Sequence, residues 1–169
     1  DHGVYAIRYA GINEMKQVEQ WLAMNKAQNF QQWKDAIALN HIQSFNFVYA
    51  NKHGDIHFIH NAQLPVRAPG WNWQQYLPGD RSELIWRDYH PTSVLPQVTN
   101  PQSGFVHSAN QTPFNISEAR DNPLPAHAPE NGGWQTRMTN RATRGLELFE
   151  EFDQISFDEA WQLKHDNRY

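Results

Sequence analysis

The segment that decides the fold reads FNFVYANKHGDIHFIH at residues 45–60. Two runs rich in aromatic and β-branched residues flank a short polar loop that contains one glycine. This arrangement predicts an antiparallel β-hairpin. Because side chains alternate between the two faces of a strand, Phe45, Phe47 and Tyr49 should share one face, and Asn46 should lie on the other. The hairpin is therefore expected to have one aromatic face.

Helical patterns lie on both sides of this hairpin. Upstream, apolar residues recur every three or four positions in two stretches separated by residues 27–29, which predicts two amphipathic helices, with Asn29 as the N-cap of the second. Downstream, a similar spacing from Trp134 onward predicts a third helix. Ser156 and Glu159 have the spacing of a capping box and predict a short fourth helix.

Two further strands are expected outside the hairpin. Residues 3–10 form a β-branched and aromatic run that ends before Gly11, and residues 104–108 form another short run. The chain between 64 and 101 is rich in turn residues and proline and should form a long, packed, irregular excursion. These elements predict an α+β fold with antiparallel strands. A length of 169 residues fits a single domain over residues 1–169.

The composition excludes several classes of protein. The net charge is -4 and the Lys and Arg residues are scattered, so there is no basic stripe that would bind nucleic acid. No apolar run approaches the length of about 18 residues that a membrane-spanning helix needs. The chain has no cysteine, which excludes disulfides and thiol catalysis. Seven Trp and nine Phe predict a core or cleft built from aromatic rings.

Histidine and acidic residues gather around the hairpin loop, at His53, Asp55, His57 and His60. Imidazole and carboxylate groups are common metal ligands, but on a strand Asp55 and His57 share a face while His60 points away. We therefore interpret them as surface or hairpin-tip residues. The sequence has no HExxH or CxxC motif, no serine in a GxSxG elbow and no glycine-rich phosphate loop, so zinc, serine-triad and nucleotide chemistry lack a supporting motif.

The stretch NPQSGFVHSANQTP at residues 100–113 is the second informative segment. A turn leads into the expected strand, which ends at Asn110 and is followed by Thr-Pro two residues later. From the residues alone, Asn110 is either an ordinary turn residue or a side-chain donor to a developing oxyanion. Residue chemistry leaves both interpretations open.

Several short stretches, taken in their order and spacing, resemble one family of enzymes. They are NKAQNF at 25–30, NFVYA at 46–50, GDI at 54–56, WNW at 71–73, LPG at 77–79, the 100–113 stretch and TRMTNR at 136–141. Over about residues 5–144 the chain resembles the penicillin acylase and acyl-homoserine-lactone acylase family of N-terminal-nucleophile hydrolases, in a central-to-late part of the β chain. This implies an αββα sandwich in which an N-terminal Ser, exposed by autoproteolytic processing, attacks an amide carbonyl with its own α-amino group as base.

The resemblance also implies roles for individual residues. Asn110 matches the family's oxyanion-binding asparagine, and Arg137 matches an arginine that supports the mouth of the site. Trp21 and Phe45 match positions that line the acyl pocket, although both could be ordinary core residues. Asp121 falls where some members hold a structural calcium ion, whose ligands are carboxylate and carbonyl oxygens. No cofactor is implied for catalysis itself.

The resemblance further implies that the chain is a fragment of an amidohydrolase. Family β chains begin with Ser, whereas this chain begins with Asp1, so the nucleophile should lie outside it and the isolated fragment should be inactive. The expected partners are the remainder of its own precursor, namely the α chain and the N-terminal part of the β chain, and a small N-acyl substrate. The expected location is the periplasm or the exterior of the cell.

Two other functions are compatible with the residues. The first is a Trp-rich, non-catalytic module that binds a ligand or a carbohydrate through stacking on exposed rings. The second is a structural or interaction domain without a ligand. A binding module should work as the isolated chain, whereas a hydrolase fragment should need its missing parts.

Overall fold

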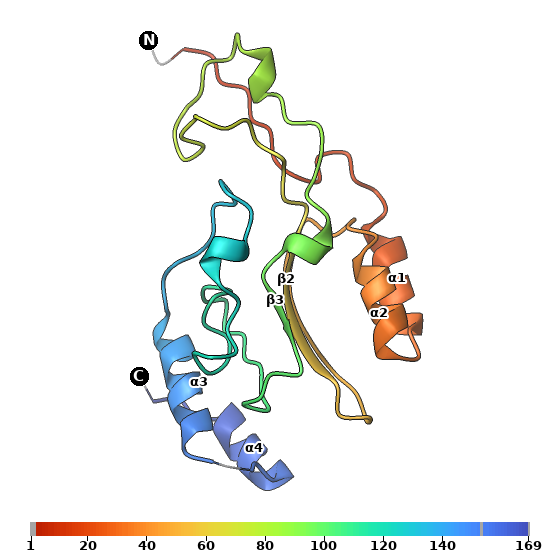
Figure 1. Cartoon of the computed structure of the whole chain (residues 1–169), viewed down its shortest axis with the longest axis vertical. Coiled ribbons are helices and arrows are strands. Elements are labelled where there is room, and N and C mark those ends of the chain that lie inside the picture. Colours follow the sequence, from red (N-terminus) through yellow and green to blue (C-terminus); the bar gives the residue numbers. More distant parts are fainter. Residues whose placement is uncertain (1–2, 153, 169) are drawn as a thin grey trace.

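The computed structural model describes residues 3–152 and 154–168, so Asp1 lies outside the described part (Figure 1). The regular elements are α1 (Gln17–Lys26), α2 (Phe30–Ile37), β1 (Ser44–Ala50), β2 (Ile56–Ala62), β3 (Gln97–Thr99), α3 (Asn140–Glu150) and α4 (Phe157–Lys164), with short 3-10 turns at Ser82–Leu84, Thr92–Val94 and Pro125–His127. Helices and antiparallel strands are both present, which confirms the α+β fold class. Among the described residues, no helix is long and apolar enough to cross a membrane.

The three strands form one antiparallel sheet in the order β1-β2-β3. Phe47 pairs with Ile59 in the hairpin, and Phe58 pairs with Val98 in the third strand. The side chain of Asn51 fixes the turn because its oxygen accepts hydrogen bonds from two backbone N–H groups in the loop, at 2.8 and 3.1 Å. The predicted hairpin is therefore confirmed.

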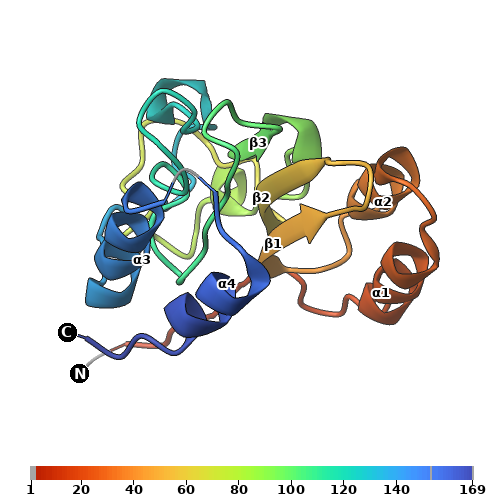
Figure 2. The same cartoon turned by 90° about the horizontal axis from the view of Figure 1, so that it is seen from below.

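Helices α1 and α2 cover the aromatic face of the hairpin, and they lie on one side of the sheet in both views (Figures 1 and 2). Trp33 of α2 packs edge-on against Phe47 at 6.3 Å and lies 4.9 Å from Tyr49, measured between ring centroids. The buried core on this face consists of Met24, Trp33, Ala36, Ile37, Ile42, Phe47 and Ile59. Burial of this apolar surface is the main force that holds the helices to the sheet.

The predicted helix boundaries are confirmed at two of three starts. The side-chain oxygen of Asn29 accepts a hydrogen bond from the N–H of Gln32 at 2.9 Å, and Ser156 and Glu159 form a capping box at α4. The third helix begins at Asn140, with Thr139 as its N-cap, and the prediction that it begins near Trp134 is wrong. Trp134 lies in irregular chain, where its ring packs against the small buried cluster of Ala62, Leu64 and Leu95.

Irregular chain, α3 and α4 lie on the other side of the hairpin (Figure 2). On this face, the side-chain nitrogen of Asn46 donates to the hydroxyl of Ser108 at 3.2 Å, and the ring of His60 lies edge-on to Trp134 at 5.7 Å. We call this the polar face of the hairpin. Its contacts are made largely by loops, whereas the aromatic face is covered by helices.

The run at residues 3–10 is not a strand, contrary to the prediction. A strand requires a hydrogen-bonded neighbour, and no ladder to this run is present within the described ranges. It runs instead beside the irregular excursion (Figure 1), where the guanidinium of Arg8 lies over the ring of Trp86 at 4.1 Å and donates to the Trp86 carbonyl at 2.9 Å. The side chains of Val4 and Ile7 are exposed.

The run at residues 104–108 is not a strand either, and the third strand of the sheet is Gln97–Thr99. A backbone bond links the His107 N–H to the Ile116 carbonyl at 2.8 Å, and the side chain of Ser117 donates to the Phe105 carbonyl. These isolated hydrogen bonds pair backbone groups of the run, but they do not form the ladder of a β-strand. The prediction of a strand here is therefore wrong, and the run is held by one backbone bond and by side-chain contacts.

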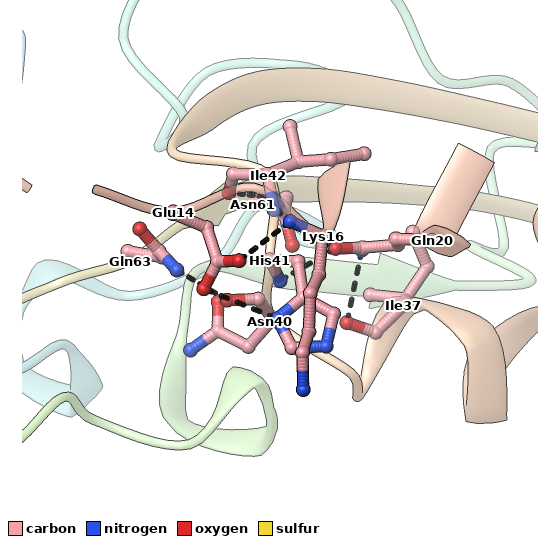
Figure 3. Close-up of polar contacts among 9 residues, drawn as sticks. All are labelled: Glu14, Lys16, Gln20, Ile37, Asn40, His41, Ile42, Asn61 and Gln63. Carbon is pink, nitrogen blue, oxygen red and sulfur yellow. Dashed lines mark hydrogen bonds and ion pairs between the residues drawn. The ribbon is translucent and has the colours of Figure 1, made fainter. Parts of the chain in front are cut away.

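Buried polar side chains fix the position of α1 relative to the start of the hairpin (Figure 3). The side-chain oxygen of Gln20 accepts from the backbone N–H groups of His41 and Ile42 at 2.6 and 2.9 Å. Its nitrogen donates to the Ile37 carbonyl at 3.3 Å. A carboxylate oxygen of Glu14 lies 3.3 Å from Nδ1 of His41. Residues 37–42 are therefore attached to α1 directly before the first strand.

Candidate functional site

The turn that carries Asn110 is held from behind by Gln111. The side-chain oxygen of this buried glutamine accepts from the Ala109 N–H at 2.6 Å. Its nitrogen donates to the carbonyls of His107 and Asn115, both at 3.1 Å. Asn110 itself is exposed and has a positive φ of 64°, a backbone conformation that asparagine tolerates better than most residues. The turn thus presents its side chain to solvent from a well-braced backbone.

Arg141 of α3 orients the amide group of Asn110. Its Nη2 atom donates to Oδ1 of Asn110 at 3.2 Å and to the Ala109 carbonyl at 3.1 Å. A guanidinium group only donates hydrogen bonds, so the atom of Asn110 that faces it must be the oxygen. The Nδ2 amide group has no acceptor among the described residues and is free to donate to a ligand.

The polar face of the hairpin positions this turn from the other side. Oδ1 of Asn46 lies 2.6 Å from Nδ1 of His60, and Nδ2 of Asn46 donates to Ser108, two residues before Asn110. Since Oδ1 is an acceptor, Nδ1 of His60 must carry the proton of the neutral ring. Burial lowers the pKa of His60, which keeps the ring neutral near pH 7. The sheet and α3 therefore hold the turn between them.

Arg137 lies in the irregular stretch before α3 and is exposed. Its backbone N–H donates to the side-chain oxygen of Gln135 at 3.2 Å, and its guanidinium has no acceptor among the described residues. Arg141, and not Arg137, is the arginine that contacts Asn110. Sequence reasoning quoted Arg141 within the 136–141 stretch but gave it no role. No local signal in the sequence distinguished Arg141 from Arg137, because only Arg141 lies in α3 and its contact with Asn110 is long-range.

Trp21 of α1 and Phe45 of β1 are brought together on the aromatic face. Their ring centroids are 5.7 Å apart in an edge-to-face arrangement, and Phe45 also stacks on Phe47 at 5.5 Å. Trp21 is 37% exposed and Phe45 is 54% exposed, so neither is an ordinary core residue in this part of the protein. The pair lies across β1 from Asn46 and the Asn110 turn, and β1 is an edge of the described sheet.

Asp121 is a half-buried carboxylate that already has hydrogen-bond donors. Its Oδ2 accepts from the Ser103 N–H at 2.8 Å and lies 3.9 Å from Nε of Arg120. The bond from Ser103 is the main reason why the pKa of Asp121 is lowered, so the group is ionised at neutral pH. Within the described ranges, no group of three histidine or acidic residues could hold a metal. Asp121 fits a calcium site only as one ligand among several from elsewhere.

The histidines of the hairpin do not converge. His57 and His60 point to opposite faces of β2, as predicted, but the interpretation of all of them as surface residues is wrong for His57. His57 is buried against Phe30 and Trp33, and its Nδ1 lies 2.8 Å from the Thr99 hydroxyl. Its burial, reinforced by the charge of Lys34, lowers its pKa to about 4.

Comparison with known proteins identifies the family. A family model described as penicillin amidase matches residues 1–169. Penicillin G acylase of Escherichia coli is 29% identical over 143 residues, which make up 85% of this chain but only 16% of that protein. The solved structure of a thermostable penicillin G acylase from Alcaligenes faecalis, in its orthorhombic form, matches with a TM-score of 0.68 at 24% identity, covering 89% of this chain and 25% of that one. On the match over its whole length, the chain belongs to the penicillin amidase family.

Proposed function

We propose that the chain is part of an amidohydrolase that cleaves the linear amide of N-acyl compounds, of the penicillin or N-acyl-homoserine-lactone type. Family membership supports an amidohydrolase, and the nucleophile would be an N-terminal Ser outside these residues with its own α-amino group as base. The Asn110 turn is the observation on which the proposal rests. Its amide oxygen is bound by Arg141, and its amide nitrogen is left to donate.

An amide carbonyl under nucleophilic attack gains negative charge on its oxygen. A donor that is already oriented stabilises this charge without reorganising during the reaction. Arg141 orients the Asn110 amide, and Gln111 braces the backbone that carries it. We therefore assign Asn110 as the side-chain donor to the oxyanion.

The other predicted site residues are assigned supporting roles in the same enzyme. We propose that the exposed Trp21 and Phe45 pack against the apolar acyl group, since their paired rings lie beside the edge strand β1. Arg137, whose guanidinium is exposed, would support the substrate at the mouth of the site. Asp121 would be one ligand of a structural calcium ion, and hard cations take carboxylate oxygens.

The partners of the chain follow from the same proposal. The remainder of the precursor, including the α chain and the N-terminal part of the β chain, would supply the nucleophile and the second oxyanion donor. The chain is proposed to form a single unit over residues 1–169, inactive by itself, and the processed enzyme would work in the periplasm or outside the cell.

Asn110→Ala in the complete processed enzyme tests the central assignment. Loss of one oxyanion donor should lower kcat by about 100- to 1000-fold with little change in KM. Asn13→Ala is the matched control, because Asn13 is also exposed and has a positive φ of 68°. An unchanged kcat for Asn110→Ala would exclude the oxyanion role. Phenylacetyl amides and long-chain N-acyl-homoserine lactones as substrates would reveal the acyl preference.

The structure gives little support to the alternative function of a Trp-rich binding module. The seven Trp residues are spread along the chain, with three of them in the irregular excursion, and Trp33 and Trp86 are buried. Trp73 and Trp134 each donate their indole N–H to a backbone carbonyl, at 3.0 and 3.1 Å. Hydrolysis by the isolated 169-residue chain would contradict both this module and the proposed external nucleophile.

A further inference from the structure

A cavity of about 940 Å³ lies between α3, α4 and residues His107 and Ser108. This volume is within the range of pockets that bind small molecules. The apolar part of its wall comes from Leu148 and Phe149 of α3 and from Ile155 and Leu163. Asn110 and the Trp21–Phe45 pair do not line it, but Arg141 does, so the cavity adjoins the site proposed above without including the oxyanion donor or the acyl-contact pair.

One charged group in the wall, the guanidinium of Arg144, is already neutralised by carboxylates. Arg144 of α3 donates from Nε and Nη2 to the two carboxylate oxygens of Asp166, at 3.2 and 2.9 Å. It also contacts Glu147 at 3.4 Å, and these carboxylates raise its pKa. Since Asp166 follows α4, the pair ties α4 to α3 and leaves Arg144 little net charge for a ligand.

Three other cations in the wall remain available, on Arg141, Lys164 and Arg168. Arg141 donates to a carbonyl and to an amide oxygen, and Lys164 lies over the Trp161 ring at 5.6 Å. Within the described ranges, none of the three side chains has a carboxylate within 4.0 Å. A partly enclosed apolar wall with unneutralised cations favours a ligand that carries one negative charge and an apolar body.

His107 adds a neutral donor to the same wall. Nε2 of Gln111 lies 3.1 Å from Nδ1 of His107, and an amide nitrogen only donates, so the ring proton must be on Nε2. Burial and the charge of Arg141 lower the pKa of His107, so the ring stays neutral at pH 7. Nε2 faces Gly145, where an added Cβ would clash with the ring. A helical glycine usually destabilises, and here it allows α3 to approach the imidazole.

We propose that this cavity binds a monoanionic carboxylate with an alkyl or aryl body. The carboxylate faces Arg141 and Lys164, and the apolar body lies against Leu148, Phe149 and Leu163. Arg141 then contacts both this ligand and Asn110, which places the cavity next to the proposed oxyanion donor. The binding proposal does not depend on the proposed hydrolytic function.

Isothermal titration of the full-length protein with decanoate tests the proposal. Decanoate should bind with a measurable heat, while decanol, which lacks the charge, and acetate, which lacks the apolar body, should bind at least about tenfold more weakly. Equal affinity for decanol, or no binding of decanoate, would overturn the proposal.

Variants locate the binding. Lys164→Gln should weaken decanoate binding about tenfold and leave turnover unchanged, and Lys164→Glu should weaken it further. Lys52→Gln, at the exposed hairpin tip, is the control and should change nothing. Decanoate that binds in the acyl pocket would instead respond to Phe45→Ala and not to Lys164→Gln, and that result would reject the cavity while leaving the proposed function intact. The melting temperature of each variant confirms folding.

Discussion

The two faces of the hairpin are stabilised by different means. On the aromatic face, the helices α1 and α2 bury rings against Phe47 and Tyr49, and the contacts are apolar. On the polar face, loops are held by amide and hydroxyl groups, with Asn46 as the link between β2 and the Asn110 turn. Apolar packing tolerates small shifts, whereas a hydrogen bond requires a defined geometry. The polar face is therefore suited to hold a donor in one orientation.

Trp33→Ala should give the largest effect, because it removes the ring at the centre of the aromatic face. Trp33 is 7% exposed, and truncation of a buried aromatic residue costs about 3–5 kcal/mol of unfolding free energy. Trp161→Ala, at a position that is 56% exposed, should cost less than about 1 kcal/mol. Denaturant unfolding of both variants measures the difference. Similar values would mean that the aromatic face does not dominate stability.

Stability measured over a pH series tests the effect of His57, the buried titratable group on the aromatic face. The pKa of His57 is about 4 in the folded protein, against about 6.5 in an unfolded chain. Between these values the unfolded state binds more protons, so stability should fall as the pH falls from 6.5 to 4, by up to about 3 kcal/mol. His57→Gln should reduce this slope, while His53→Gln at the exposed tip should leave it unchanged. A slope that persists in His57→Gln would assign the effect to other groups, such as His60.

Asn46→Ala should give a smaller loss on the polar face. It removes the bonds to Ser108 and His60, and we expect a cost of about 1–2 kcal/mol in unfolding free energy. Val48→Thr provides the comparison on the same strand face, since Val48 is exposed, and it should change stability by less than about 0.5 kcal/mol. If Asn46→Ala changed the unfolding free energy as little as Val48→Thr, the bonds from Asn46 toward the Asn110 turn would not contribute measurably to stability.

Local signals in the sequence predicted the elements that local interactions form. The hairpin, the helix break before Asn29 and the capping box at Ser156 depend on residues within a few positions of one another, and the structure confirms them. The strands expected at 3–10 and 104–108 are absent from the described sheet, because a strand also needs a neighbour that its own sequence does not specify.

The residues of the candidate site show the same difference between local signals and long-range contacts. Asn110 was singled out by the family resemblance of the 100–113 stretch, whereas its orientation depends on Arg141, 31 residues away. The burial of His57 depends on Phe30 and Trp33, which come from α2. No periodicity within the hairpin indicates such long-range partners. The environment of these residues therefore could not be predicted from the neighbouring sequence.

The attachment of Gln20 to His41 and Ile42 limits how the chain length can vary. Adding or removing one residue between α2 and β1 would separate these N–H groups from Gln20. It would also turn Phe45 and Phe47 to the opposite face, because side chains alternate along a strand. The irregular excursion between β2 and β3 can absorb extra residues at its surface turns. Insertions and deletions among relatives should therefore concentrate in that excursion and avoid the six residues between Ile37 and Ser44.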